Sequence, residues 1–148
     1  MPKDLFTEEE IEQIHKAIEE AELNTSGEIR VHIDLYCKED VLDRAAFVFE
    51  KLEMHKTALR NSVLFYLATA DQKFAILGDA GINQKVPSNF WDSIKEDMLK
   101  QFKQSEYTKG LSQGIKKAGE QLQAHFPWKE GDEDELDNEI SFGKKMRR

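Results

Sequence analysis

Cysteine and long apolar runs are scarce in this sequence. Its 148 residues contain one cysteine, Cys37, so no disulfide can form within the chain and a reducing compartment is expected. No window approaches the roughly 18 consecutive apolar residues that a membrane-spanning helix needs. The N-terminus, MPKDLFTEEE, has no apolar core of signal-peptide length. We therefore predict a cytoplasmic protein with no membrane partner.

Basic residues are in the minority. The chain has 21 Lys and Arg against 29 Asp and Glu, a formal net charge of −8. This balance argues against nucleic acid as a partner, because phosphate binding needs a basic face. We expect one domain over residues 1–127. A flexible tail, 128–148, is acidic and then basic, and its acidic part is a candidate protein-binding segment.

Two apolar runs organise the rest of the chain. Ser62–Thr69 and Phe74–Leu77 are rich in β-branched and aromatic residues and flank a short polar break. This pattern predicts two strands that are buried on both faces and joined as a hairpin. The hairpin would return Gly78–Gly81 to the point where the first of these strands begins.

The elements around the hairpin favour an α/β fold. Residues Glu28–Tyr36 alternate apolar and polar side chains, which predicts a strand with one buried face, closer to an edge strand than the hairpin strands. Helices are expected after the caps Thr7, Asp40 and Ser88 and again towards the C-terminus. A helix between two strands usually makes a right-handed crossover with parallel strands. We predict a three-layer α/β/α sandwich with a small mixed sheet that contains a central β-hairpin.

This topology brings polar residues to one edge of the sheet. Glu28 and Asp79 supply carboxylates at neighbouring strand ends, and Asn61 supplies an amide oxygen. Such oxygens suit a divalent cation, calcium in the first place and magnesium as the alternative. Arg60 would serve as a phosphate or charge partner there. The competing interpretation is a plain salt-bridge network in which the acids pair with Arg60 or Arg30.

Other sources of chemistry are weaker. Trp91 follows the candidate site on the next helix, where it either walls a cleft or anchors the core. Cys37 and Arg44 resemble a cysteine-phosphatase loop only superficially, and the four histidines are scattered singly. No nucleophile or histidine–glutamate metal motif is present in the sequence.

Four segments together resemble the TPM domain family: SGEIRV (26–31), RNSVLFYLA (60–68), ILGDAGI (76–82) and EYTKGLSQGI (106–115). The acidic tail ending in DELDNEISFG (134–143) resembles that of a bacterial subgroup of the family. The family includes thylakoid-lumen proteins described as acid phosphatases. The resemblance covers roughly Phe6 to Phe126. It implies an α/β/α sandwich, a calcium site reported in some members and weak phosphatase activity reported in some plant members.

Three functions follow as hypotheses. The first is a divalent-cation-binding domain, non-catalytic or weakly catalytic. The second is a metal-dependent acid phosphatase that uses the same strand-edge residues. The third is a protein-interaction module that recruits its partner through the acidic tail. The sequence assigns no catalytic residue and no organic cofactor.

Overall fold

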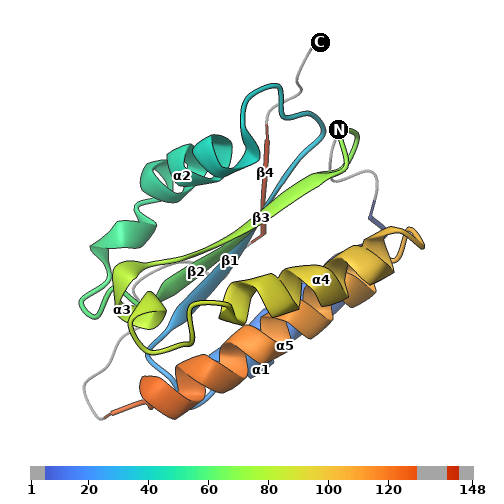
Figure 1. The fold of residues 1–148 in the computed structure, drawn as a ribbon. Coiled ribbons are helices and arrows are strands. Elements are labelled where there is room, and N and C mark those ends of the chain that lie inside the picture. Colours follow the sequence, from blue (N-terminus) through green and yellow to red (C-terminus); the bar gives the residue numbers. More distant parts are fainter. Residues whose placement is uncertain (1–5, 130–139, 144–148) are drawn as a thin grey trace.

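The computed structural model describes residues 6–129 and 140–143 of the chain. In that part, helices surround one four-stranded mixed sheet with the strand order β3-β2-β1-β4 (Figure 1). The helices are α1 (Glu8–Glu22), α2 (Val41–Lys51), η2 (Met54–Lys56, a 3-10 helix), α3 (Ala80–Asn83), α4 (Phe90–Phe102) and α5 (Tyr107–His125). The strands are β1 (Glu28–Asp34), β2 (Ser62–Ala68), β3 (Lys73–Gly78) and β4 (Ile140–Phe142).

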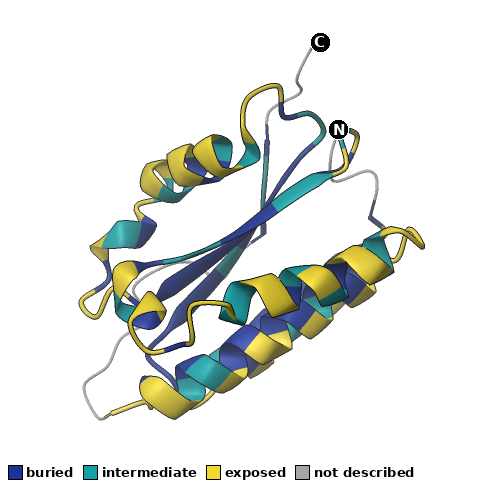
Figure 2. Ribbon diagram, viewed as in Figure 1, coloured by how far each residue is buried: buried dark blue, intermediate teal, exposed yellow. Residues whose placement is uncertain are grey.

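The predicted three-layer arrangement is confirmed. Helices α1, α4 and α5 cover one face of the sheet and α2 covers the other (Figure 1). Buried residues concentrate in the strands and on the sides of the helices that face the sheet (Figure 2). The larger core joins the Val31 face of the sheet to α1, α4 and α5, and the smaller core joins the Tyr66 face to α2 and Met54. Within the described residues, no helix has both the length and the apolar character needed to cross a bilayer.

The predicted strand directions are also confirmed. Strand β1 pairs parallel to β2, with Glu28 opposite Ser62, and β2 pairs antiparallel to β3, with Val63 opposite Gly78. The hairpin and the helical crossover therefore return three strand ends to one edge of the sheet. This edge, formed by residues 26–28, 60–62 and 78–81, is called the rim below.

The prediction that β1 resembles an edge strand is wrong. Strand β4 pairs parallel to β1, with Ser141 opposite His32, so β1 lies between β2 and β4. Both faces of β1 are consequently buried, including the polar side chains of His32 and Asp34. The acidic run of the tail and its basic end fall in 130–139 and 144–148, outside the described residues.

Capping residues in the sequence predict the starts of α1 and α2 correctly but not the start of α4. The capping box at the start of α1 is confirmed, because Thr7 accepts from the backbone of Glu10 and Glu10 reaches back to the backbone of Thr7. Asp40 caps α2 through the amides of its first turn. Ser88 does not cap α4, since the residue before that helix is Asn89 and its side chain makes no capping hydrogen bond. The short helix α3 was not predicted.

Candidate functional site

The rim brings Glu28 and Asp79 to opposite sides of one residue. On one side of Ser62, Glu28 of β1 is its partner in the parallel register. On the other side, the backbone amide of Asp79, just after β3, donates to the Ser62 carbonyl at 2.9 Å. Two strand spacings separate their backbones, about 10 Å in all. Both acids are buried, with 2% of Glu28 and 6% of Asp79 exposed.

Asp79 is engaged by Arg60. The guanidinium donates from Nε to Oδ2 at 2.6 Å and from Nη2 to Oδ1 at 2.8 Å, a bidentate ion pair. Oδ1 also accepts from the Ala80 amide at 2.8 Å, which caps α3. The hydrogen bonds and charge of Asp79 raise the pKa of the Arg60 guanidinium. This ion pair is the contact that the competing salt-bridge interpretation expects between Asp79 and Arg60, and the role of Arg60 as a phosphate or charge partner of the site stays a prediction.

The rim backbone is tightly folded around this pair. Arg60 adopts the left-handed conformation, with φ 52°. Its carbonyl accepts from the Gly81 amide at 2.7 Å, and a Cβ at Gly81 would lie 2.0 Å from the Leu59 carbonyl oxygen. Only glycine allows this approach. Gly81 thus holds the loop after β3 against the loop before β2 and fixes Asp79 beside Arg60.

Asn61 contributes a buried oxygen. Its side chain is 1% exposed, and its amide nitrogen donates to the Ser26 hydroxyl at 3.1 Å. The side-chain oxygen Oδ1 is buried and accepts no hydrogen bond. Leaving such an acceptor unpaired costs about 1–3 kcal/mol. Glu28, Ser62 and Asp79 lie in one row across the three strands. Asn61 precedes Ser62 by one residue, so it does not belong to this row.

Trp91 packs over the end of β3. Its indole Nε1 donates to Asn83 Oδ1 at 2.8 Å, and Asn83 in turn donates to the Gly78 carbonyl at 2.8 Å. A Cβ at Gly78 would lie 2.7 Å from Cζ2 of the indole ring. Trp91 therefore stands beside the rim on the α4 side, next to the strand end that carries Asp79.

Comparison with known proteins identifies the family. The model of the TPM domain family matches residues 2–121. This chain belongs to the TPM domain family. Among curated protein sequences, none matches it. The predicted assignment to a bacterial subgroup stays a prediction.

Two solved structures share the fold of this TPM domain. The NMR structure of the BA42 protein from the psychrophilic bacterium Bizionia argentinensis is 50% identical, with a TM-score of 0.85, over 93% of this chain and 95% of that one. The N-terminal domain of the cg2496 protein from Corynebacterium glutamicum is 10% identical, with a TM-score of 0.63, over 97% of this chain and 84% of that one. The second likeness concerns the fold alone.

The donor set at the rim is oxygen only. Across residues 6–129 and 140–143, no group of three or more His, Cys, Asp or Glu side chains is placed to hold a metal ion. Two carboxylates and one unpaired amide oxygen are the side-chain donors that this TPM domain offers there. Carboxylate and amide oxygens are the kind of ligand that a hard cation such as calcium takes, with carbonyl and water oxygens in its remaining positions.

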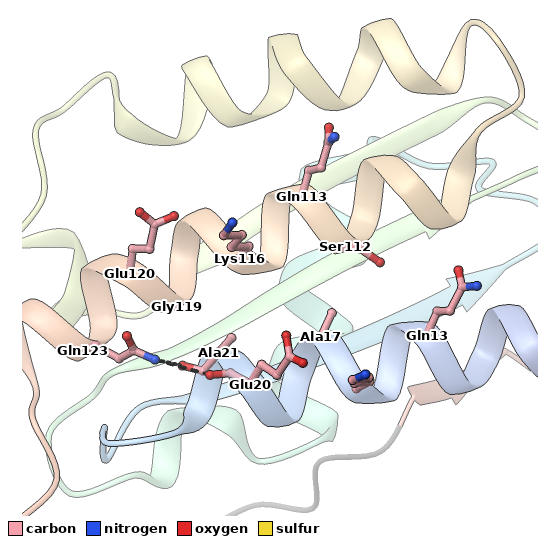
Figure 3. Close-up of a pocket in the computed structure, with 11 residues that line it drawn as sticks. Gln13, Ala17, Glu20, Ala21, Ser112, Gln113, Lys116, Gly119, Glu120 and Gln123 are labelled. Carbon is pink, nitrogen blue, oxygen red and sulfur yellow. Dashed lines mark hydrogen bonds between the residues drawn. The ribbon is translucent and has the colours of Figure 1, made fainter.

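A hollow lies away from the rim, between α1 and α5 (Figure 3). It measures about 610 Å³, and small residues on both helices, Ala17, Ala21 and Gly119, form part of its wall. Gln123 reaches across it to the carbonyls of Glu20 and Ala21 at 3.3 Å. The rim residues do not line this hollow.

A buried polar cluster that sequence patterns do not predict lies on the α2 side of the sheet. Asp34, with none of its side chain exposed, accepts from Tyr66 Oη at 2.6 Å, Arg44 Nε at 3.0 Å and His32 Nε2 at 3.1 Å. Burial alone would raise the pKa of Asp34, but these three hydrogen bonds outweigh burial and hold the pKa at about 2. Burial and the nearby Asp34 charge raise the pKa of the Tyr66 hydroxyl.

One signal in the sequence could have found part of this cluster. His32 and Asp34 lie two residues apart on a strand, so their side chains share a face. The alternation by itself predicts only that both belong to the polar side of an edge strand. The hydroxyl of Ser141, which bonds His32 Nδ1 at 2.7 Å, depends on the unpredicted strand β4.

Proposed function

We propose that this TPM domain binds a divalent cation, calcium in the first place, at the rim. The ligands would be the carboxylates of Glu28 and Asp79 and the side-chain oxygen of Asn61, with backbone carbonyls and water completing the shell. Magnesium is the alternative ion. The domain would act as a binding or interaction module rather than as an efficient enzyme.

The observation that carries the proposal is that Asp79 binds a positively charged side chain, that of Arg60, through both of its carboxylate oxygens. The Arg60 guanidinium lies 2.6 and 2.8 Å from the two carboxylate oxygens of Asp79. Half of the Arg60 side chain is exposed, so it can swing into solvent without disturbing the core. A divalent ion would take over the charge compensation of Asp79 and would add Glu28 as a second anionic ligand.

The buried oxygen of Asn61 adds a second line of support. An amide oxygen that is buried without a hydrogen bond carries a cost that coordination would remove. The net charge of −8 also favours cations near the surface. Asn61 lies outside the row of the two acids, so the three ligands would be arranged irregularly. We therefore prefer calcium to magnesium, because calcium tolerates irregular coordination geometry.

Isothermal titration of calcium into the full chain tests the proposal. The wild type should bind one ion, and Asp79→Asn should weaken binding by about tenfold or more because it removes one anionic ligand while keeping an oxygen to cap α3. Asp97→Asn is the matched control, since Asp97 also forms an ion pair, with Lys117, but lies on α4 away from the rim. Equal binding by Asp79→Asn and wild type would refute the site.

A metal-dependent phosphatase reaction at these residues would need the same ion first. Cation binding is therefore the step to measure before any assay of turnover. Phosphatase activity that is equal in wild type and Asp79→Asn would come from another source.

A further inference from the structure

A second site lies on the α2 side of the sheet, in the part of the polar cluster that reaches β4. Ser141 stands directly opposite His32 in the register of β4 and β1. Its Oγ lies 2.7 Å from His32 Nδ1, and His32 Nε2 lies 3.1 Å from Asp34 Oδ1. A serine, a histidine and an aspartate thus form one continuous hydrogen-bonded chain.

The position of the protons follows from the acceptor at one end. The Asp34 carboxylate can only accept, and it already receives Tyr66 Oη and Arg44 Nε. His32 Nε2 must therefore carry a proton, which leaves Nδ1 as the acceptor in the neutral ring. The Ser141 hydroxyl then donates to Nδ1 at 2.7 Å in preference to the Val31 carbonyl at 3.4 Å.

Ser141 and His32 are open to a hollow of about 430 Å³. This volume falls within the range of sites that take small molecules. Asp34 lies behind them, fully buried. Side chains of α2 form the opposite wall, with the cations Arg44 and Lys51 and the ring of Phe47 among them. The chain of hydrogen bonds therefore runs from the sheet interior to a space that a substrate can enter.

We propose that Ser141 is a nucleophile for small carboxylic esters, with His32 as its general base and Asp34 as the group that orients His32. The Ser141 Oγ–carbon bond forms while the hydroxyl proton passes to His32 Nδ1. The bond to the alcohol oxygen then breaks, and the alcohol leaves with that proton. Water repeats the sequence on the acyl-serine and releases the acid, so ester and water give alcohol and acid.

The surroundings supply the remaining requirements. The carbonyl oxygen of the ester becomes negative during attack, and Lys51 provides positive charge in the same hollow, whereas the charge of Arg44 is paired with Asp34. In the familiar serine hydrolases the carboxylate bonds Nδ1 and the serine bonds Nε2. The two nitrogens exchange roles here, which preserves the relay because either nitrogen of neutral imidazole can accept.

Labelling with a fluorophosphonate probe, located by peptide mass spectrometry, tests the proposal on the full chain. We expect the probe on Ser141 in the wild type, none at that position in Ser141→Ala, and labelling of His32→Gln slowed by about a hundredfold or more. Ser93→Ala, which removes an exposed serine on α4, should label like the wild type. Hydrolysis of p-nitrophenyl acetate should fall with the same variants.

Two results would overturn the nucleophile assignment. One is a folded wild type whose Ser141 takes up no label at millimolar probe, or no more label than its exposed serines. The other is a folded His32→Gln that labels at the wild-type rate. The comparison of wild type with Ser141→Ala decides the matter even if His32→Gln fails to fold. None of these outcomes bears on calcium binding at the rim.

Discussion

Arg60 and Asp79 face each other in a bidentate ion pair at the rim, 2.6 and 2.8 Å apart at their two contacts. The pair joins the loop before β2 to the end of β3. It also places a monovalent cation where the proposed calcium ion would bind. The affinity of the rim for calcium should therefore depend on how easily the Arg60 side chain moves away from Asp79.

Replacing Arg60 by glutamine should strengthen calcium binding. The variant removes the resident positive charge while Asp79 keeps both oxygens, so the ion no longer competes with a guanidinium. We expect the dissociation constant to fall roughly two- to fivefold, the change that follows if the ion pair with Asp79 contributes up to about 1 kcal/mol. Isothermal titration measures the change, and Lys117→Gln, which breaks the exposed pair with Asp97, is the control. Weaker calcium binding by Arg60→Gln would show that Arg60 supports the ion site instead of blocking it.

Replacing Asn61 by aspartate should make stability depend on calcium. The new carboxylate would be buried at the position of the Asn61 side chain, beside Ser26, so without the ion it should lower the melting temperature. Added calcium should then raise the melting temperature of Asn61→Asp more than that of the wild type. The exposed variant Asn89→Asp should show no such dependence. A calcium response no larger in Asn61→Asp than in the wild type would remove Asn61 from the ligand set.

The Asp34 cluster predicts how stability changes in acid. The pKa of Asp34 lies at about 2 in the folded protein against an ordinary value of 3.8. A depressed pKa gives stability that is fully present above pH 3.8 and is lost as the pH falls towards 2, about 2 kcal/mol in all. Urea unfolding of wild type and Asp34→Asn between pH 7 and pH 2 measures the contribution. The gap between the two proteins should narrow below about pH 4, and a constant gap would contradict this account of the cluster.

The close contact between α1 and α5 predicts that replacing Gly119 by alanine destabilises the protein, whereas helix propensity alone predicts that it stabilises the protein. Alanine is favoured over glycine in a helix by about 1 kcal/mol. A Cβ at Gly119 would lie 2.5 Å from Ala21 Cβ and 2.7 Å from Ala21 Cα, so the helices would have to separate. We expect Gly119→Ala to lower the free energy of unfolding by about 1–3 kcal/mol, as overpacking usually does. Gln113→Ala, at an exposed position on the same helix, should change it by less than about 0.5 kcal/mol. Stabilisation by Gly119→Ala would show that the helix contact is looser than described.

Sequence patterns predicted the parts of the fold that local rules determine. The capping box at Thr7, the hairpin and the parallel return of β2 all depend on spacing within about 30 residues, and handedness rules supply the rest. The prediction that both hairpin strands are buried on both faces is correct for β2 and wrong for β3, which is an edge strand with partly buried ends. The rim followed from those directions alone, which is why Glu28 and Asp79 could be placed at one edge before any coordinates. The sequence left two interpretations of these residues open, a cation site and a salt-bridge network, and the contact of Asp79 with Arg60 belongs to the second.

The remainder depends on contacts that no local pattern announces. Strand β4 has three residues, too few for a period, and pairs with β1 from more than a hundred residues away. Without it β1 looked like an edge strand, and His32 looked like an isolated histidine. The cap at Asn89 in place of Ser88 is a smaller error of the same kind, since either residue type can precede a helix.

The most direct test of the account is a calcium titration of the full-length protein followed by its amide resonances. Saturating calcium should move the resonances of Glu28, Asn61 and Asp79 along one binding curve, and Asp79→Asn should abolish or greatly weaken the shifts. Resonances at the rim that stay in place at saturating calcium would contradict the proposed ion site.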